Sequence, residues 1–253
     1  MTAPGSPTHP DETAERRRPR LAAGALWFLV LEGLLALTTV PTLVWLLFLD
    51  PVWQDVALIV ALGLPVGPAV SATLFAWRRF TQGEDTGPAR HFWRGYRLNW
   101  ADALRIWAPS LTLLTLLAVV LLSLPGDDAP AAAGAVAGLV TVLLAVSAAH
   151  AMLVVSLFSF RTRDVVRVAV YFVISSPSAS LRVLAIIAVG AAAAWFVHPA
   201  LPVALGSVLT YLLWRNGVPI AAEVERRFVS GAAGTPDGGA GVEHADRAGD
   251  DDR

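Results

Sequence analysis

Residues 131–160 read AAAGAVAGLVTVLLAVSAAHAMLVVSLFSF, and His150 is the one ionisable side chain in this run. A helix needs roughly 20 apolar residues to cross a bilayer core of about 30 Å. An isolated strand is no alternative, because lipid offers no partners for exposed backbone N–H and C=O groups. The stretch therefore predicts a transmembrane helix, and with it an all-α membrane protein.

Five further apolar stretches are candidates for spanning helices. They are Leu21–Leu49, Val56–Trp77, Leu104–Leu124, Leu181–Val197 and Leu201–Ala222, the last interrupted by Arg215 and Asn216. We therefore expect a polytopic membrane helical bundle of six transmembrane helices, within a membrane domain at residues 21–228. The basic tail at residues 1–20 and the acidic tail at residues 229–253 carry too little apolar surface to order, so both are expected to be disordered.

The composition agrees with lipid as the main partner of the chain. Hydrophobic residues make up 55% and charged residues 15% of the sequence, whereas soluble domains carry about 25% charged residues. Cysteine is absent, which excludes disulfides and thiolate chemistry. The net charge of −1 argues against nucleic acid as a partner. All 19 basic residues are arginine, a bias that suggests a GC-rich bacterial genome.

The arginines alternate between the connections. They precede the first stretch, follow the second, fourth and sixth, and are missing from the other three connections, where Asp50, Asp55, Asp127, Asp128 and His198 lie. Cytoplasmic loops of membrane proteins collect Lys and Arg. The pattern predicts a multi-pass protein of the bacterial plasma membrane with both termini in the cytoplasm.

Two of the arginine-bearing connections are expected to form interfacial amphipathic helices on the cytoplasmic side. The first, at residues 89–98, has a basic face and an aromatic face; its candidate residues are Arg90, Phe92, Trp93, Arg94, Tyr96, Arg97 and Asn99. Such a helix lies in the headgroup plane as a topological anchor, or it offers a docking surface to a cytoplasmic partner. The second helix is expected at residues 164–174, before Ser175-Ser176-Pro177.

The start of the third span is expected just after the first of these helices. Asn99 and Asp102 are both residue types that cap helix N-termini. Arg105 follows Asp102 by three residues, a spacing at which the two side chains can pair on a helix.

The second apolar stretch contains a predicted helix break at Pro65, Gly67 and Pro68. Each proline removes a backbone donor, and the glycine permits a close approach between helices. A broken helix either shapes the packing of the bundle or lines a binding site.

Three ionisable residues, Glu32, His150 and Arg215, fall inside apolar stretches. Counted from the nearest arginine cluster, each lies roughly 17 Å from the expected inner boundary at a rise of about 1.5 Å per residue. They therefore form a candidate intramembrane polar cluster. One interpretation has Glu32 and His150 relaying a proton or binding a polar solute, with Arg215 as the counter-charge. The other has Glu32 paired with Arg215 only to hold the bundle together, or Arg215 at the inner interface.

Motifs of catalysis are missing from the sequence. It contains no phosphate-binding loop of the Walker type, no HExxH, no GxSxG and no metal-spaced cluster of His or Cys. We therefore expect no enzyme, no catalytic residues, no metal site and no cofactor.

The region from the second into the third stretch resembles the YesL-like family of bacterial integral membrane proteins, whose molecular function is unknown. The residues that carry the resemblance are Gly67-Pro68-Ala69, Ala72, Gly83-Glu84, Phe92-Trp93, Tyr96 and Asn99. The resemblance implies an accessory or regulatory role in carbohydrate uptake or utilisation, with a membrane transporter complex as the partner. The alternative is a small secondary transporter with a polar site at the midplane.

Overall fold

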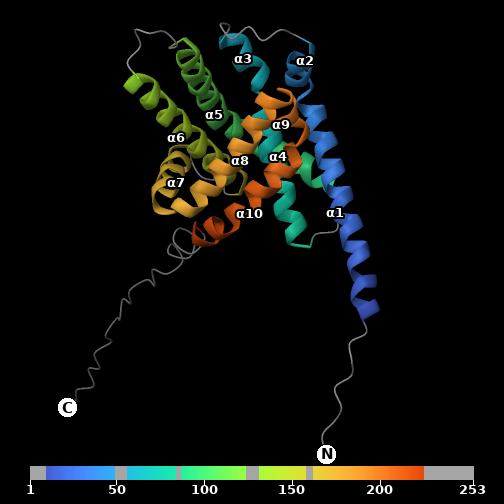
Figure 1. Ribbon diagram of the computed structural model, residues 1–253. Helices are drawn as coiled ribbons and strands as arrows, with labels where there is room; N and C mark the ends of the chain where they lie inside the picture. The colour runs from blue at the N-terminus through green and yellow to red at the C-terminus, as the bar shows by residue number, and fades with distance from the viewer. Residues whose placement is uncertain (1–9, 49–55, 84–86, 124–130, 158–161, 225–253) are drawn as a thin grey trace, which may run out of the picture.

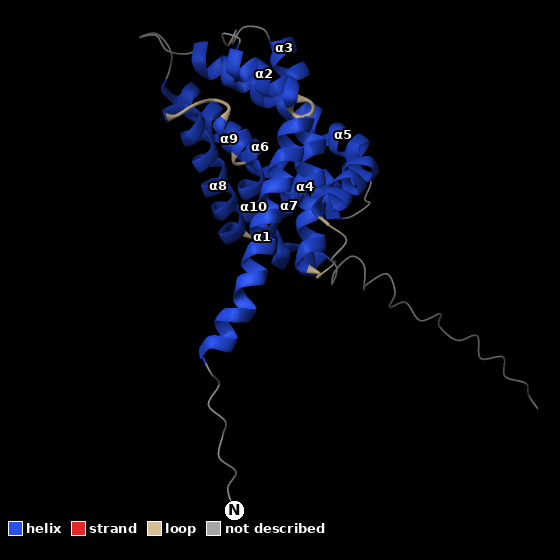
Figure 2. Cartoon of the chain, turned by 90° about the vertical axis from the view of Figure 1, so that its right-hand side faces the viewer, coloured by secondary structure: helices blue, strands red, loops and turns tan. Residues whose placement is uncertain are grey.

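The computed structural model describes residues 10–48, 56–83, 87–123, 131–157 and 162–224. All regular structure in these ranges is helical. The helices are α1 (Pro10–Thr38), α2 (Val40–Phe48), α3 (Val56–Gly63), α4 (Val66–Thr81), α5 (Pro88–Ser123), α6 (Ala131–Leu157), α7 (Thr162–Ser175), α8 (Pro177–Phe196), α9 (Leu201–Ala204) and α10 (Gly206–Val224). Figure 1 shows them as one bundle, with α2 and α3 at one end. The start of α1 and the end of α10 lie at the other end, and Figure 2 shows α1 extending beyond the bundle there.

Four helices in the described ranges are long and apolar enough to cross a membrane: Val56–Thr81, which joins α3 and α4, Pro88–Ser123, Ala132–Leu157 and Pro177–Phe196. A bent pair, Ala23–Thr38 with Val40–Phe48, makes a fifth if it counts as one span. The expected class, an all-α polytopic membrane protein, agrees with this. The expected sixth span is divided into the short α9 and α10, and it is not among these candidate spans.

The first apolar stretch, expected as one helix, is broken. α1 and α2 meet at an angle of 77°. Pro41 has no N–H to donate, and its ring excludes a straight continuation. The hydroxyls of Thr38 and Thr39 donate to the carbonyl of Leu35 at 3.0 and 2.8 Å, which occupies an acceptor at the break. Thr42 then donates to the carbonyl of Leu62, so the bend brings α2 against α3.

The predicted break in the second stretch coincides with a short interruption between α3 and α4. α3 ends at Gly63 and α4 begins at Val66, with Pro65 between them. The carbonyl of Gly63 accepts a hydrogen bond from the indole Nε1 of Trp107 on α5, at 2.9 Å. A Cβ atom on Gly67 would lie 2.5 Å from Cγ of the same Trp107. The glycine therefore permits the close helix approach that the sequence predicted, and α5 partly replaces the hydrogen bonds that the prolines remove.

The expected boundary before the third span is wrong. α5 runs from Pro88 to Ser123 without interruption, so Asn99 and Asp102 lie inside the helix instead of capping it. Ala103 and Ile106, on the next turn, are buried, and this packing outweighs the local preference of Asn and Asp for helix ends. The predicted pair of Asp102 with Arg105 is confirmed at 2.5 Å on the surface.

The second expected interfacial helix exists as α7, followed by Ser176 and by Pro177 at the start of α8. Val165, Ala169 and Phe172 are buried along one face of α7, so this face packs on protein. α1 already begins at Pro10, so part of the tail expected to be disordered is helical. Its Glu, Ala and Arg residues all favour helices. The expected acidic tail at 229–253 lies outside the described residues.

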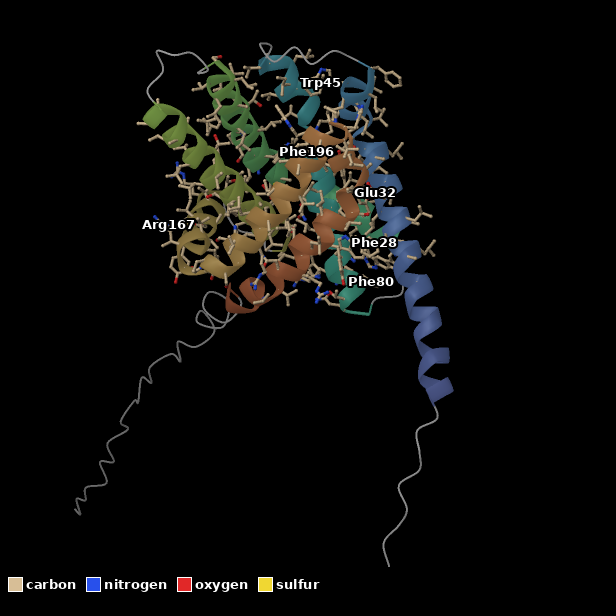
Figure 3. The ribbon with its side chains drawn as sticks, in the orientation of Figure 1. Phe28, Glu32, Trp45, Phe80, Arg167 and Phe196 are labelled. Atoms are coloured by element: carbon tan, nitrogen blue, oxygen red, sulfur yellow. The ribbon has the colours of Figure 1, made fainter. Side chains whose placement is uncertain are left out.

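An aromatic cluster joins α1, α4 and α10. Its rings are Trp27, Phe28, Trp77, Phe80 and Tyr211. The closest ring centroids, those of Phe28 and Trp77, lie 4.5 Å apart. Figure 3 labels Phe28 on α1 and Phe80 at the end of α4. The cluster packs these two helices against each other and against Tyr211 of α10.

Candidate functional site

The carboxylate of Glu32 is the best-defined polar group in the interior. Its Oε2 accepts two hydrogen bonds from Ser207, one from the backbone N–H at 2.8 Å and one from the hydroxyl at 2.5 Å. Ser207 is the second residue of α10. The first N–H groups of a helix have no partner within the helix and carry a partial positive charge. A negative acceptor at this point therefore caps α10.

The chain around Ser207 is held from a second side. Trp77 on α4 donates its indole N–H to the carbonyl of Ser207 at 3.2 Å. Next to it, a Cβ on Gly206 would lie 2.9 Å from the methyl carbons of Leu35, so glycine lets α1 approach closely. We call this meeting point of α1, α4 and α10 the Ser207 junction; Figure 3 labels Glu32 on the side of α1 that faces it.

One oxygen of the junction has no donor. The Oε1 atom of Glu32 is buried, and no group in the described residues donates to it. Carboxylate oxygens in apolar surroundings are costly unless they are hydrogen-bonded. This oxygen is therefore the acceptor at which a proton or a polar ligand would be stabilised.

His150 makes no hydrogen bond to the described residues of the junction. It is buried in α6, and its Nδ1 is 2.9 Å from the carbonyl of Val146. Because a carbonyl only accepts, Nδ1 carries the hydrogen and Nε2 is an acceptor. Within the described ranges Nε2 is buried and receives no hydrogen bond. His150 is therefore a polar residue with a free acceptor, but no hydrogen bond joins it to Glu32.

Arg215 forms no ion pair with Glu32, so the interpretation in which these two residues pair is wrong. Arg215 follows Ser207 by eight positions on α10, about 12 Å along the axis at about 1.5 Å per residue. Its side chain is exposed, whereas the neighbours Trp214 and Asn216 are buried. Glu32 and Arg215 were considered as a pair because both were counted to a similar depth in the membrane. Their side chains point in different directions, and so they do not meet.

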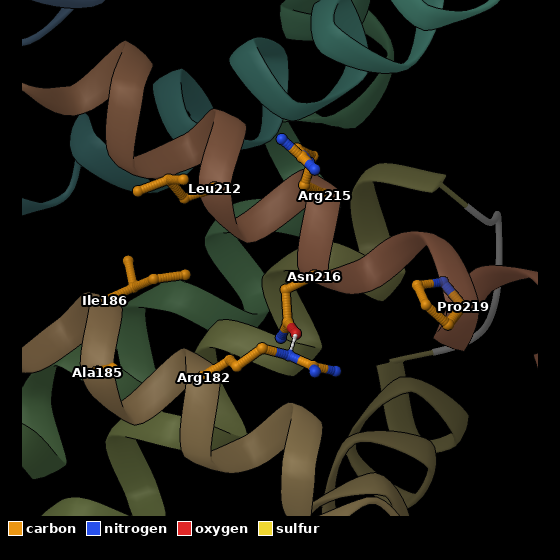
Figure 4. A pocket seen from close by; sticks show the side chains of 7 residues that line it. All are labelled: Arg182, Ala185, Ile186, Leu212, Arg215, Asn216 and Pro219. Carbon is orange, nitrogen blue, oxygen red and sulfur yellow. Dashed lines mark hydrogen bonds between the residues drawn. The ribbon is translucent and has the colours of Figure 1, made fainter.

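Arg215 instead lines a groove between α8 and α10. The cavity has a volume of about 510 Å³, and its walls are Arg182, Ala185, Ile186, Leu212, Arg215, Asn216 and Pro219 (Figure 4). Arg182 donates from Nε to Oδ1 of Asn216 at 2.6 Å, and Nδ2 of Asn216 donates to the carbonyl of Ala179 at 3.0 Å. Asn216 thus fixes Arg182 relative to α10. These hydrogen bonds join residues of two different helices, so no sequence pattern predicted them.

The predicted amphipathic segment at the start of α5 has the expected two faces, but the aromatic one packs on protein. Phe92 is fully buried, His91 stacks on Trp27 at 5.9 Å, and a Cβ on Gly95 would lie 2.8 Å from Phe75. The segment is therefore not a separate helix lying on lipid. An amphipathic pattern predicts which face is covered, and here α4 and α1 cover it in place of the headgroups.

The opposite face of this segment is open. Arg90, Arg94 and Arg97 are exposed, and Trp93 is 39% exposed. Tyr96 and Asn99 are half-buried at its margins. We call the three arginines the α5 basic face; its role as a docking surface stays a prediction.

One segment of the chain matches a model of a protein family. Residues 25–121 match DUF624, a family of proteins of unknown function. DUF624 is the family of the YesL-like proteins, so the match agrees with the resemblance in this region. It covers Glu32, the Pro65 break and the α5 basic face, and it ends before His150, Ser207 and Arg215. No curated protein and no solved structure matches the chain.

Proposed function

We propose that the protein is a non-enzymatic accessory or regulatory component of the bacterial plasma membrane, linked to carbohydrate uptake or utilisation. The observation that carries the accessory role is the Ser207 junction. There the intramembrane carboxylate of Glu32 is engaged by the start of α10. A transporter that works by alternating access must move its helices past each other. A hydrogen-bonded junction that joins α1, α4 and α10 opposes such movement, and it therefore favours the role of a scaffold. The link to carbohydrates rests on the resemblance to the YesL-like family.

The proposal includes six passes with both termini in the cytoplasm. The distribution of arginines supports it, since they gather on alternate connections. The path of the last helices supports it as well, because α10 ends at the end of the bundle where α1 begins (Figure 1). α9 and α10 would then make the sixth pass as a broken span whose start is capped by Glu32.

The α5 basic face is the proposed contact with the transporter partner. Its arginines are exposed on a helix whose other side is anchored in the core, so the face is presented rigidly. Arginine favours carboxylate partners through charge-assisted hydrogen bonds. We therefore propose an acidic cytoplasmic surface of a sugar transporter as the partner.

Crosslinking in native membranes, followed by purification and mass spectrometry, tests this. The wild type should recover an identified subunit of a sugar transporter. Arg94→Glu on the α5 basic face should lose it, and Arg167→Glu, a matched reversal at an exposed arginine of α7, should keep it. Recovery of no transporter subunit by the wild type would sink the accessory function.

A second candidate is a small secondary transporter. Two buried acceptors, Oε1 of Glu32 and Nε2 of His150, have no donor in the described part of the chain, and three of the passes contain a break. Half-helices beside polar groups are typical of transporter sites. This function predicts proton-coupled sugar uptake into proteoliposomes, abolished by Glu32→Gln. Uptake equal to that of empty vesicles would exclude it under those conditions.

A further inference from the structure

The α8–α10 groove combines charge and apolar surface in an order that matches a lipid. Arg182 lies five residues into α8, about 8 Å from the helix start at about 1.5 Å per residue. Figure 4 shows its guanidinium extending away from Ile186 and Leu212, toward the Pro219 end of the groove. One end of the groove is therefore cationic and the other is apolar.

Among the side chains that the structure describes, no acidic group compensates the positive charge of the groove. No carboxylate lines the groove, and neither Arg182 nor Arg215 forms an ion pair within the ranges described. Arg182 uses Nε for Asn216, and its two terminal amino groups make no hydrogen bond to the described residues. A guanidinium can bind phosphate oxygens through two parallel N–H groups. Two arginines on neighbouring membrane helices, with no described carboxylate beside them, favour an anionic ligand.

The relay through Asn216 distinguishes this groove from a chance pair of surface arginines. Asn216 is buried, with 8% of its surface exposed, and both ends of its amide are used. Its hydrogen bond to Ala179 fixes the side chain, and this in turn orients Arg182. An orientation fixed before the ligand binds reduces the entropy lost on binding.

The apolar part of the groove fits a hydrocarbon chain. Leu212 is 43% exposed, and Ala185 and Ile186 form the facing wall on α8. We propose that the α8–α10 groove binds an anionic phospholipid, with its phosphate at Arg182, its negative charge also attracted by Arg215 at the other margin of the groove, and an acyl chain along Ile186 and Leu212. A free anion would satisfy the arginines alone and leave this apolar wall unused, which favours the lipid.

Native mass spectrometry of the full chain in detergent tests the proposal. The protein is titrated with phosphatidylglycerol, with phosphatidylcholine and with inorganic phosphate. We expect phosphatidylglycerol to be retained in preference to phosphatidylcholine, and its affinity to fall about fivefold in Arg182→Gln and in Arg215→Gln, the usual effect of one basic residue at a lipid surface. Arg167→Gln, which removes an exposed arginine of α7, should bind as the wild type does.

Several results would overturn the proposal. They are equal retention of the two lipids, an equal fall in Arg167→Gln, and unchanged affinity in both groove variants. Displacement of the lipid by millimolar inorganic phosphate would assign the site to a free anion, and retention of an acidic protein in place of lipid would assign it to a protein partner. Arg215 is exposed and makes no hydrogen bond in the described structure, so Arg215→Gln is expected to fold. If Arg182→Gln fails to fold, Arg215→Gln still decides the test.

Discussion

Replacing Glu32 by Gln tests the Ser207 junction directly. The carboxylate accepts two hydrogen bonds, and bonds to a charged group contribute about 1.5–3 kcal/mol each, against about 0.5–1.5 kcal/mol for neutral ones. The amide of Gln keeps the shape and one acceptor but loses the charge that faces the start of α10. We expect a loss of about 2–3 kcal/mol in the free energy of unfolding, or roughly 5–10 °C in Tm for a chain of this size.

The assay is thermal unfolding in a mild detergent, followed by tryptophan fluorescence, because Trp77 belongs to the junction. Asp102→Asn is the matched control: it removes a carboxylate from an exposed pair with Arg105, which should cost less than about 1 kcal/mol. Ser207→Ala removes only the hydroxyl donor and should couple with Glu32→Gln by about 1 kcal/mol in a double-mutant cycle. If Glu32→Gln and Asp102→Asn have the same melting temperature, the junction does not stabilise the bundle.

Three other substitutions probe the packing of α5. Gly67→Ala would place a methyl group 2.5 Å from the ring of Trp107 and should cost about 1–3 kcal/mol by overpacking, whereas Gly138→Ala, with open space around it, should be neutral or stabilising in the same melts. Trp107→Phe removes the donor to the carbonyl of Gly63 and should cost about 1–3 kcal/mol; a melting temperature equal to wild type would contradict that bond. Asn99→Pro should cost about 3 kcal/mol or more, because α5 is continuous there, and circular dichroism showing no loss of helix or stability would instead favour a boundary at this position.

The sequence was most informative where the cause of a structure is local. Proline cannot donate a backbone hydrogen bond wherever it lies, so the break around Pro65 followed from composition alone. The 77° bend before Pro41 had a comparable signal in Thr38 and Thr39, whose hydroxyls compete for helix carbonyls. Hydropathy likewise predicted the helical membrane class, because a long apolar run has few other stable conformations in lipid.

The partners of polar side chains could not be predicted in the same way. Depth along a helix can be counted, but the direction of Glu32 depends on how α1 and α10 pack, and its partner Ser207 looked like an ordinary apolar-helix serine. The prediction that the segment around Phe92 lies on lipid was wrong for a related reason. Amphipathicity predicts that one face is covered, and it does not distinguish lipid from the side of α4. Gly95, between the arginines, was the available signal for close packing against Phe75.

The Ser207 junction also has a consequence for the order in which the protein is made. Glu32 and Ser207 are 175 positions apart, and ribosomes add about 5–20 residues per second. The carboxylate of the first helix therefore waits roughly 10–35 s before the residue that binds it has been synthesised. During that interval an unsatisfied carboxylate is held in or beside the bilayer, where ionisable groups are costly. Synthesis of the start of α10 ends that exposure, so the junction can form only after all the other described helices have been made.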